Sequence, residues 1–289
     1  MRHCFCQFEL AFRYNSITWT FEDTSLMEKN NAKPNVGTQS IERATRVLRI
    51  IASHNSPGLR LVDISKQAKL ERPTAHRILK CLIAEGLVRQ SAESRRYFLG
   101  HLIFELGLAA SSSFNLRDIC HPSLVRLAEK TGDTVFLAIR SGADSVCIDR
   151  VEGSFPIKTL TLEVGTRRPL GVGAGGLALL MKLPAPTQQE IISANALRMV
   201  DYNNLTIPAL MRLLQCCQEL GFARNDAQVT PGATSVALPI HSRSGEPILA
   251  ISIGAISSRM VEDRQKELVS MLRAEIKTLE SSIEDTAHP

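Results

Sequence analysis

The stretch that decides the fold is LVDISKQAKLERPTAHRILKCLIAEGL, from Leu61 to Leu87, because it contains two short amphipathic helical patterns separated by a four-residue turn. In the second pattern apolar residues recur at positions i, i+3, i+4 and i+7, the spacing of one buried helical face. Pro73 suits the first turn of this helix, where its missing N–H costs no hydrogen bond. This layout is typical of a DNA-reading helix-turn-helix. The residues of the buried face are Ala75, Ile78, Leu79 and Leu82.

The second helix also has a polar face that is rich in hydrogen-bond donors. Helix-turn-helix proteins contact base edges and phosphates with such residues near the start of their second helix. An ordinary helical hairpin with a solvated basic face is the alternative, because charge on an exposed helix face is common. The candidate DNA-binding residues on this face are Arg72, Thr74, His76, Arg77 and Lys80.

The distribution of charge favours the DNA-reading interpretation. Residues 38–100 contain twelve Lys and Arg against five Asp and Glu, a net charge of +7. The whole chain carries +5, so the remaining residues sum to −2 and the basicity is concentrated in this region. A focused positive field is expected of a surface that binds phosphates.

Two short strand patterns and an upstream helix complete a small domain. The strands, Leu87 to Gln90 and Arg95 to Leu99, flank a polar turn and predict a wing, with Arg95 and Arg96 as candidate phosphate contacts at its base. Ser40 is expected to cap the upstream helix. The sequence therefore predicts a winged helix-turn-helix over residues 38–100. The expected buried face of the upstream helix consists of Ile41, Ala44, Leu48 and Ile51.

Length and composition bound the rest of the chain. With 289 residues and 44% hydrophobic residues, it is long enough for two domains with separate cores. No apolar run reaches the ~20 residues of a membrane helix, so we expect a soluble, cytoplasmic protein. Seven cysteines without a CxxC pair indicate reduced thiols. His3, Cys4 and Cys6 lack the spacing of a zinc site, and we predict no metal and no cofactor.

Residues 1–37 are predicted to be an N-terminal extension. Six of the chain's aromatic residues lie in the first 26 positions without a helical or strand period, and Met27 follows them. Our hypothesis is that Met27 is the physiological start. An arm that packs on the folded domains is the alternative.

A linker helix is predicted after the wing, within residues 101–114. Leu102, Leu106 and Ala109 recur there at helical spacing. This apolar stripe either covers the core of its own domain or packs against the same helix of a second chain. Dimerisation is the more economical interpretation, because two half-sites give a DNA-binding protein more specificity than one.

The remaining part, residues 115–289, alternates helical and strand patterns and predicts an α+β domain with a largely antiparallel sheet. Gly171 to Gly176 is glycine-rich and lacks the features of a P-loop or of a dinucleotide fingerprint. Its backbone N–H groups at a helix start suit a small carboxylate, and a tight turn that lets the helix approach the sheet is an equal alternative. The expected helices are 118–130, 177–182, 188–194, 205–221 and 261–283, and the expected strands are 134–139, 145–151, 158–162, 234–240 and 247–254.

The order of several short motifs resembles the IclR-type (isocitrate lyase regulator) family of bacterial transcription regulators. The match runs from about Thr38 to the end of the chain. The resemblance implies a winged helix-turn-helix, a linker helix and a GAF-like effector-binding domain for small organic acids, in homodimers or dimers of dimers that bind a double-stranded DNA operator. The motifs are SIERA, ERPTAHRIL, EGLV, RYFLG, TGDTVFLAI, DRVEG and GTRRPLG.

The resemblance also implies an effector pocket. Its backbone amides match Gly173, Ala174 and Gly175, and its apolar walls match Ile157 and Leu160. The family's frequent cysteine is Ser235 here, its usual histidine before the glycine loop is Gly171, and its usual lysine after the loop is Leu177. The pocket aspartate falls on Asn225, with Asp226 beside it, and a serine of a later strand matches Ser252.

The mechanism expected from these features is allosteric control of operator binding by an organic acid. Two other classes stay open. One is a DNA-binding protein that responds to no ligand. The other is an enzyme that uses Cys147, Asp149 or His241, although no spacing here indicates a nucleophile paired with a base.

Overall fold

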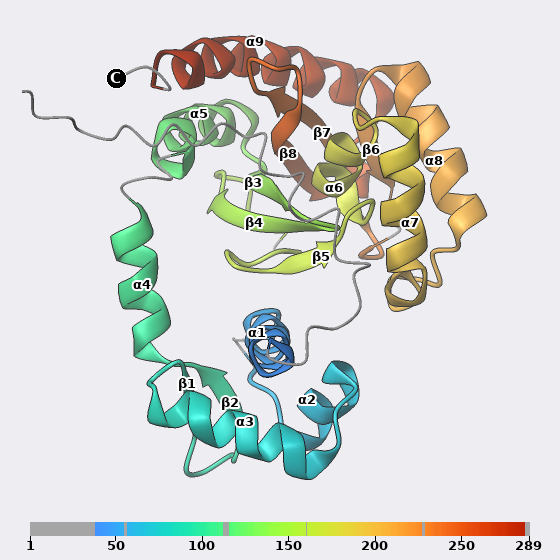
Figure 1. The fold of residues 1–289 in the computed structure, drawn as a ribbon. Coiled ribbons are helices and arrows are strands. Elements are labelled where there is room, and N and C mark those ends of the chain that lie inside the picture. The colour runs from blue at the N-terminus through green and yellow to red at the C-terminus, as the bar shows by residue number, and fades with distance from the viewer. Residues whose placement is uncertain (1–37, 55–56, 112–115, 160, 227–228, 287–289) are drawn as a thin grey trace, which may run out of the picture. The chain divides into compact units, whose positions relative to one another are not determined.

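The computed structural model describes residues 38–54, 57–111, 116–159, 161–226 and 229–286, and Figure 1 draws the others in grey. Several predictions lie outside these residues. They are the start at Met27, the nature of the N-terminal extension, the assessment of His3, Cys4 and Cys6, and the pocket wall at Leu160.

The N-terminal domain is the predicted helix-turn-helix. Three helices, α1 (Gln39–Ala52), α2 (Leu61–Ala68) and α3 (Arg72–Ala84), pack around one apolar core. Pro73 lies in the first turn of α3, as its sequence position indicates. The stripe of α3 is buried at Ala75, Leu79 and Leu82 and half-buried at Ile78. The 3.6-residue period therefore identified the face of α3 that meets the core.

Two expectations for α1 were wrong. Ser40 lies inside the helix, which begins at Gln39, so it is not the residue that precedes the first turn. Ile41 is 68% exposed, whereas Val47 and Ile51 are fully buried. The period of the stripe is right, but the first turn of α1 lies beyond the core residues that could cover Ile41.

The predicted wing is a two-stranded antiparallel sheet of β1 (Val88–Gln90) and β2 (Tyr97–Leu99). Leu59 extends this sheet by an isolated bridge to Tyr97. Gly100 follows β2 at a place where a side chain has no room, because a Cβ there would lie 2.0 Å from the carbonyl oxygen of Gly86. The wing is thus packed closely against the end of α3.

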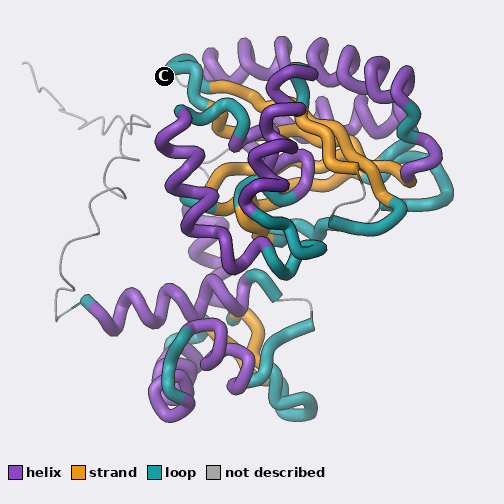
Figure 2. The backbone as a smooth tube through the Cα atoms, turned by 90° about the vertical axis from the view of Figure 1, so that its right-hand side faces the viewer, coloured by secondary structure: helices purple, strands orange, loops and turns teal. Residues whose placement is uncertain are grey.

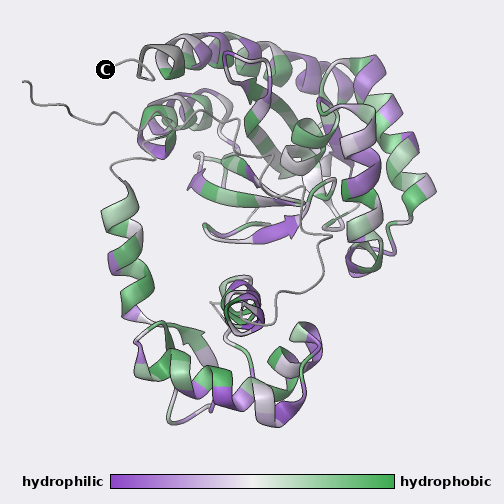
Figure 3. Cartoon of the chain, viewed as in Figure 1, coloured by the Kyte–Doolittle hydropathy of each residue, from purple (hydrophilic) through white to green (hydrophobic). Residues whose placement is uncertain are grey.

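The linker helix α4 (His101–Ser111) follows directly. None of the side chains from His101 to Ala110 is buried. Phe104 is 68% exposed, Leu106 53% and Leu108 57%, and Figure 3 shows the apolar colour along this helix. The apolar residues of α4 therefore do not fill the core of their own domain.

The C-terminal domain is built on one six-stranded sheet in the order β5-β4-β3-β8-β7-β6, with all neighbours antiparallel. This confirms the predicted α+β class. The strands are β3 (Thr134–Ser141), β4 (Asp144–Val151), β5 (Arg167–Pro169), β6 (Ala223–Asp226), β7 (Ala233–His241) and β8 (Pro247–Ile256). The helices are α5 (Leu116–Thr131), α6 (Gly173–Leu180), α7 (Ala185–Met199), α8 (Ile207–Leu220) and α9 (Glu262–Thr286).

Helices cover both faces of this sheet (Figure 2), and each face has its own core. Along β8, Leu249, Ile251 and Ile253 belong to the core formed with α5 and α9. Between them Ala250 packs on the opposite side, with α6, α7 and α8. Because side chains alternate along a strand, Ser252 also faces the side of α6.

The structure differs from the sequence prediction at the sheet's edges. The described residues of the expected strand at 158–162 do not form a strand, and two short strands, β5 and β6, were missed. Short edge strands carry too few residues for an alternating pattern to show. Three described residues of this stretch, Thr159, Thr161 and Leu162, instead line the pocket described below.

No helix among the described residues is long and apolar enough to span a lipid bilayer.

Candidate functional site

The first candidate site is the exposed face of α3. Arg72, His76 and Lys80 follow one another at four-residue spacing and are all exposed, with Arg77 beside them. Within the described residues, no hydrogen bond or ion pair involves the side chains of Arg72, Arg77 or Lys80. Thr74 is half-buried beside them. The five residues predicted on α3 thus form one surface, and its cations are available to a DNA partner.

The wing places its two arginines in different environments. Arg95 is exposed, in the left-handed backbone region with φ of 56°. Arg96 is half-buried, and its Nη1 donates to the carbonyl oxygens of Gly58 at 2.7 Å and of Pro57 at 3.3 Å. Arg89 of β1, which we had not singled out, lies over the ring of Phe98 with 4.4 Å from Cζ to the ring centroid. Arg96 therefore holds the wing against the loop before α2, whereas Arg95 extends from its turn.

These environments predict separate effects for the two arginines. Arg95→Ala is expected to reduce the salt dependence of DNA binding by about one unit of slope, because one phosphate contact is lost. Arg96→Ala is expected to lower the free energy of unfolding by about 1 kcal/mol, because the carbonyls of Pro57 and Gly58 lose their donor. Affinity titrations at several salt concentrations and urea unfolding measure the two effects. A wild-type salt slope for Arg95→Ala would remove it from the DNA surface.

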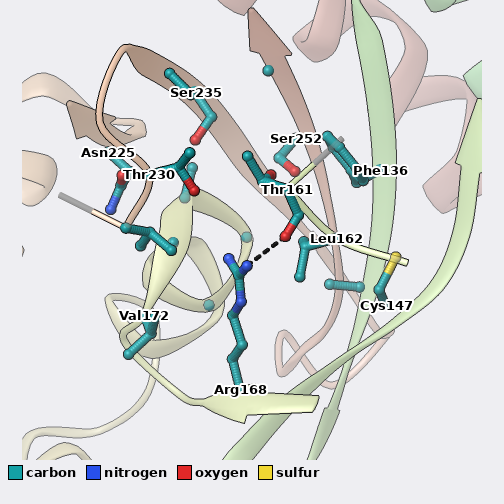
Figure 4. Close-up of a pocket in the computed structure, with 18 of the residues that line it drawn as sticks. Phe136, Cys147, Thr161, Leu162, Arg168, Val172, Asn225, Thr230, Ser235 and Ser252 are labelled. Carbon is teal, nitrogen blue, oxygen red and sulfur yellow. Dashed lines mark hydrogen bonds between the residues drawn. The ribbon is translucent and has the colours of Figure 1, made fainter. Parts of the chain in front are cut away.

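The second candidate site is a pocket in the C-terminal domain, between α6 and the sheet (Figure 4). Its empty space, counted together with the part that is open to solvent, is about 650 Å³. Its walls come from all six strands of the sheet, from the first turn of α6 and from the segment before β5. Of the predicted effector-binding residues, six line it: Gly173, Ala174, Gly175, Asn225, Ser235 and Ser252.

The glycine-rich run leads into α6, as both alternatives expected, but the helix begins at Gly173 within the run and not at residue 177. Gly173 has a φ of 76°, which favours glycine, and begins the helix. The first amides of a helix have no acceptor within it and carry the positive end of the helix dipole. A Cβ on Gly175 would lie 3.8 Å from Oγ of Ser252 and 3.5 Å from Cβ of Ala138. This loop therefore allows both close packing on the sheet and access to backbone donors.

Three strands bring the polar side chains of the pocket together. Asn225 of β6 pairs in register with Ser235 of β7, and Ser252 of β8 pairs with Phe136 of β3. Asn225 is 4% exposed and Ser252 6% exposed. The result is a cluster of neutral hydrogen-bonding groups beside the start of α6.

Two predicted residues do not line the pocket. Ile157 is 58% exposed and does not line the pocket, whereas Thr159 two residues later does. Asp226 follows Asn225 on the strand and points away, as alternation requires. Its carboxylate accepts a hydrogen bond from Oγ1 of Thr234 at 2.9 Å and lies 3.6 Å from Nη2 of Arg224. Asp226 has structural partners in place of a ligand.

Sequence reasoning missed Arg168, Thr159 and Cys147, which also line the pocket. Arg168 belongs to the motif GTRRPLG, which we used only for the resemblance. Two adjacent arginines before a buried Pro-Leu pair were the available signal, since side chains on a strand alternate and one of the two must face inward. Figure 4 shows Arg168 reaching from β5 into the middle of the pocket.

Cys147, Asp149 and His241, the residues of the enzyme alternative, do not form a nucleophile–base pair, because Sγ of Cys147 donates to the backbone carbonyl of Asp149 at 3.4 Å and not to a basic side chain. Burial raises the pKa of the Cys147 thiol to about 11, so it stays protonated at neutral pH. Asp149 accepts from Nδ1 of His121 at 2.7 Å, and His241 lies 3.1 Å from Glu280. The geometry among the described residues therefore offers no hydrogen-bonded pair of Cys147 with His241. No group of three or more His, Cys, Asp or Glu residues placed to hold a metal occurs in the described parts of the chain.

The thiols are expected to differ in reactivity. Cys81 and Cys216 are exposed, whereas burial raises the pKa of Cys120 to about 12 and that of Cys147 to about 11. At pH 8 about one Cys147 in a thousand is a thiolate, so iodoacetamide should label Cys81 and Cys216 long before Cys120 and Cys147. Peptide mass spectrometry over a time course measures this, with denatured protein as the control. Equal labelling rates in the folded protein would contradict the burial.

A basic helix-turn-helix joined to an α+β domain with a polar pocket defines a class of transcription regulator that has a DNA-binding and a ligand-binding domain. Comparison with known proteins identifies one family for both domains. The family model described as "IclR helix-turn-helix domain" matches residues 40–92, and "Bacterial transcriptional regulator IclR C-terminal" matches residues 108–280. The chain belongs to the IclR family of bacterial transcription regulators.

Similar proteins in this family are repressors. The HTH-type transcriptional repressor AllR of Escherichia coli strain UTI89 is 30% identical, over 84% of this chain and 90% of that protein. The transcriptional repressor IclR of Escherichia coli K12 is 29% identical, over 84% and 92%. A solved structure, an IclR homologue from Microbacterium hydrocarbonoxydans complexed with 4-hydroxybenzoate, is 25% identical, covers 84% of this chain and 98% of its own, and has a TM-score of 0.63.

Proposed function

We propose that the protein is a sequence-specific transcription regulator whose operator binding is controlled by a small organic acid held in the C-terminal pocket. The observation that carries this proposal is the pocket at the first turn of α6, where Gly173, Ala174 and Gly175 meet the neutral donors Ser252 and Asn225. Backbone amides at a helix start suit a carboxylate. The homologue complexed with 4-hydroxybenzoate supports an acid as the ligand class.

Residues 38–100 supply the DNA-binding half of this function. Lysine and arginine side chains on α3 and the wing contact phosphates, and residues of the first turns of α3 read base edges in the major groove. Residues 115–289 supply the effector-binding half, and residues 101–114 join the two. Because its operator is chromosomal DNA, the protein works in the cytoplasm.

The functional unit we propose is a homodimer, or a pair of dimers. The exposed apolar residues Phe104, Leu106 and Leu108 on α4 support a second copy of α4 as the partner. Two reading helices then address two half-sites, which gives a specificity that a single helix lacks. Sedimentation equilibrium of the full chain tests this, and a monomer at micromolar concentration would contradict it.

Thermal-shift screening combined with operator binding tests the proposal. Lactate, pyruvate, 3-hydroxybutyrate and 4-hydroxybenzoate are added to the full chain, and melting temperature and fluorescence anisotropy with the DNA upstream of its own gene are measured. A ligand that binds only the folded state raises stability by about 2.7 kcal/mol at one hundred times its Kd. We expect an acid that raises the melting temperature to change operator affinity as well.

The two alternatives give different results in the same experiment. An acid that is consumed, seen by mass spectrometry of the ligand, would indicate an enzyme. Operator binding without a response to any acid would indicate a DNA-binding protein that is independent of ligand. Either result would overturn the proposal.

A further inference from the structure

Among the described residues that line the pocket of the C-terminal domain, Arg168 is the only one with a charged side chain. It donates from Nη2 to the carbonyl oxygen of Thr161 at 2.5 Å and lies over the ring of Tyr202, with 5.9 Å from Cζ to the ring centroid. Neither partner carries a negative charge at neutral pH, since burial raises the pKa of the Tyr202 phenol. Within the described residues, Arg168 has no carboxylate partner.

Arg167, the neighbouring residue of β5, differs from Arg168 because it has a carboxylate partner. Nη1 of Arg167 lies 3.1 Å from Oδ2 of Asp144, and its Nη2 donates to Oγ of Ser141 at 3.1 Å. Arg167 is therefore paired with a carboxylate of the protein itself, which it shares with Arg198. Arg168 lies on the other side of β5 and has no such partner among the described residues. Burial lowers the pKa of its guanidinium, which still stays protonated at neutral pH.

The guanidinium of Arg168 lies close to the start of α6. Nη1 of Arg168 lies 3.7 Å from the point where a Cβ on Gly173 would be, so the guanidinium is next to the first turn of α6. The positive end of the helix dipole and a positive side chain thus face the same space. Two such groups repel each other, and a buried charge without a counterion is costly. An anion between them would relieve both.

A second polar group in the pocket also lacks a partner. Oγ1 of Thr159 is buried and makes no hydrogen bond with any residue that the structure describes, and Thr159 as a whole is 7% exposed. Its Cγ2 lies 3.7 Å from the Cβ position of Gly254, which pairs with Ser235 of β7. The unpartnered hydroxyl therefore belongs to the end of the pocket formed by β7 and β8, where no charged side chain lines the wall.

We infer that Arg168 is a ligand-binding residue that holds the carboxylate of the effector between its guanidinium and the first turn of α6, and that the effector is a monocarboxylic acid with a hydroxyl or oxo group at the end near Thr159 and Ser235. This inference rests on the proposed function, because it assigns the chemistry of the same pocket. A guanidinium fork matches the two oxygens of a carboxylate, and an amide of the same shape leaves the charge unpaired. Neutral analogues are therefore excluded by charge and not by size.

Matched pairs of ligands test the charge requirement. Acetate with acetamide, lactate with lactamide, and pyruvate with pyruvamide are titrated against the full chain by thermal shift and calorimetry. The variants are Arg168→Met, Arg168→Lys and the control Arg167→Met. We expect wild-type protein to bind carboxylates and to ignore the amides. Arg168→Met should lose roughly 10- to 100-fold in carboxylate affinity, as expected for a charge-assisted hydrogen bond, and Arg168→Lys should retain the preference for carboxylates.

The melting temperature without ligand separates a binding role from a structural one. Arg167→Met should melt below the wild type, because Asp144 loses a partner, and should keep the preference for carboxylates. Arg168→Met should melt close to the wild type, because the removal of an uncompensated buried charge offsets the loss of the hydrogen bond to the Thr161 carbonyl. A loss of stability as large as that of Arg167→Met would make Arg168 structural and overturn the inference.

The remaining outcomes distinguish the inference from the function on which it rests. Carboxylates that stabilise the wild type and Arg168→Met equally would overturn the role of Arg168 and leave the organic-acid pocket in place. Amides that bind as well as acids would overturn the ligand class. If no acid binds the wild type, acetate at high concentration included, the proposed function fails as well.

Discussion

Gly175→Leu is expected to abolish the response to organic acids while operator binding without ligand is retained. The Cβ itself fits, because its closest neighbours would be Ala138 at 3.5 Å and Oγ of Ser252 at 3.8 Å. The rest of a leucine side chain has to occupy the pocket in front of the first turn of α6. An acid that stabilises the wild type by about 2.7 kcal/mol at one hundred times its Kd should give no stabilisation of this variant.

Gly175→Ala is the matched control, since it adds only the Cβ that has room. It should keep the acid response in thermal shift, and both variants should bind operator DNA with wild-type affinity when no ligand is present. A wild-type acid response in Gly175→Leu would place the ligand elsewhere in the protein.

Arg77→Ala should weaken binding to the operator by about 1 to 3 kcal/mol and leave binding to unrelated DNA little changed. The reason is that Arg77 is exposed on α3 beside the row of Arg72, His76 and Lys80, so its guanidinium is available to a base edge. Competition anisotropy with operator and scrambled duplexes at one salt concentration measures the ratio of the affinities for operator and for unrelated DNA.

Arg49→Ala is the control for Arg77→Ala, because it removes the same charge from an exposed position on α1 of the same domain. It should change the affinities for operator and scrambled DNA by the same small factor. If Arg77→Ala also changes both affinities by the same factor, Arg77 either contacts a phosphate or makes no contact with DNA. Another residue of α3 would then read the bases.

The DNA-binding domain could be predicted well from sequence because its signals are local. The helical period of Ala75, Leu79 and Leu82, together with Pro73 at the helix start, depends on residues within one element. The prediction fails at Ile41 for a reason outside the helix, because burial there depends on how far the core of the other helices extends. The helical period alone predicts which face of a helix is apolar. It does not predict how far along the helix that face is buried by neighbouring elements.

The pocket was harder to predict from the sequence than the DNA-binding domain, because its walls meet only after the sheet has formed. The glycine run predicted the start of α6, and the family resemblance placed Asn225, Ser235 and Ser252, which three different strands bring together. The same resemblance placed Ile157 on a wall of the pocket, but this residue is 58% exposed and does not line it. Arg168 was missed because β5, with three residues, is too short to show an alternating pattern.

We propose that acid binding in the C-terminal pocket and operator binding by the N-terminal domain are coupled in the same molecule. Linkage requires the factor by which the acid changes operator affinity to equal the factor by which operator DNA changes acid affinity. Titrating the acid calorimetrically into free protein and into the protein–operator complex measures this directly. Our account predicts equal factors from the two titrations, about 5- to 150-fold if the coupling is of typical size. An acid affinity that operator DNA leaves unchanged would contradict it.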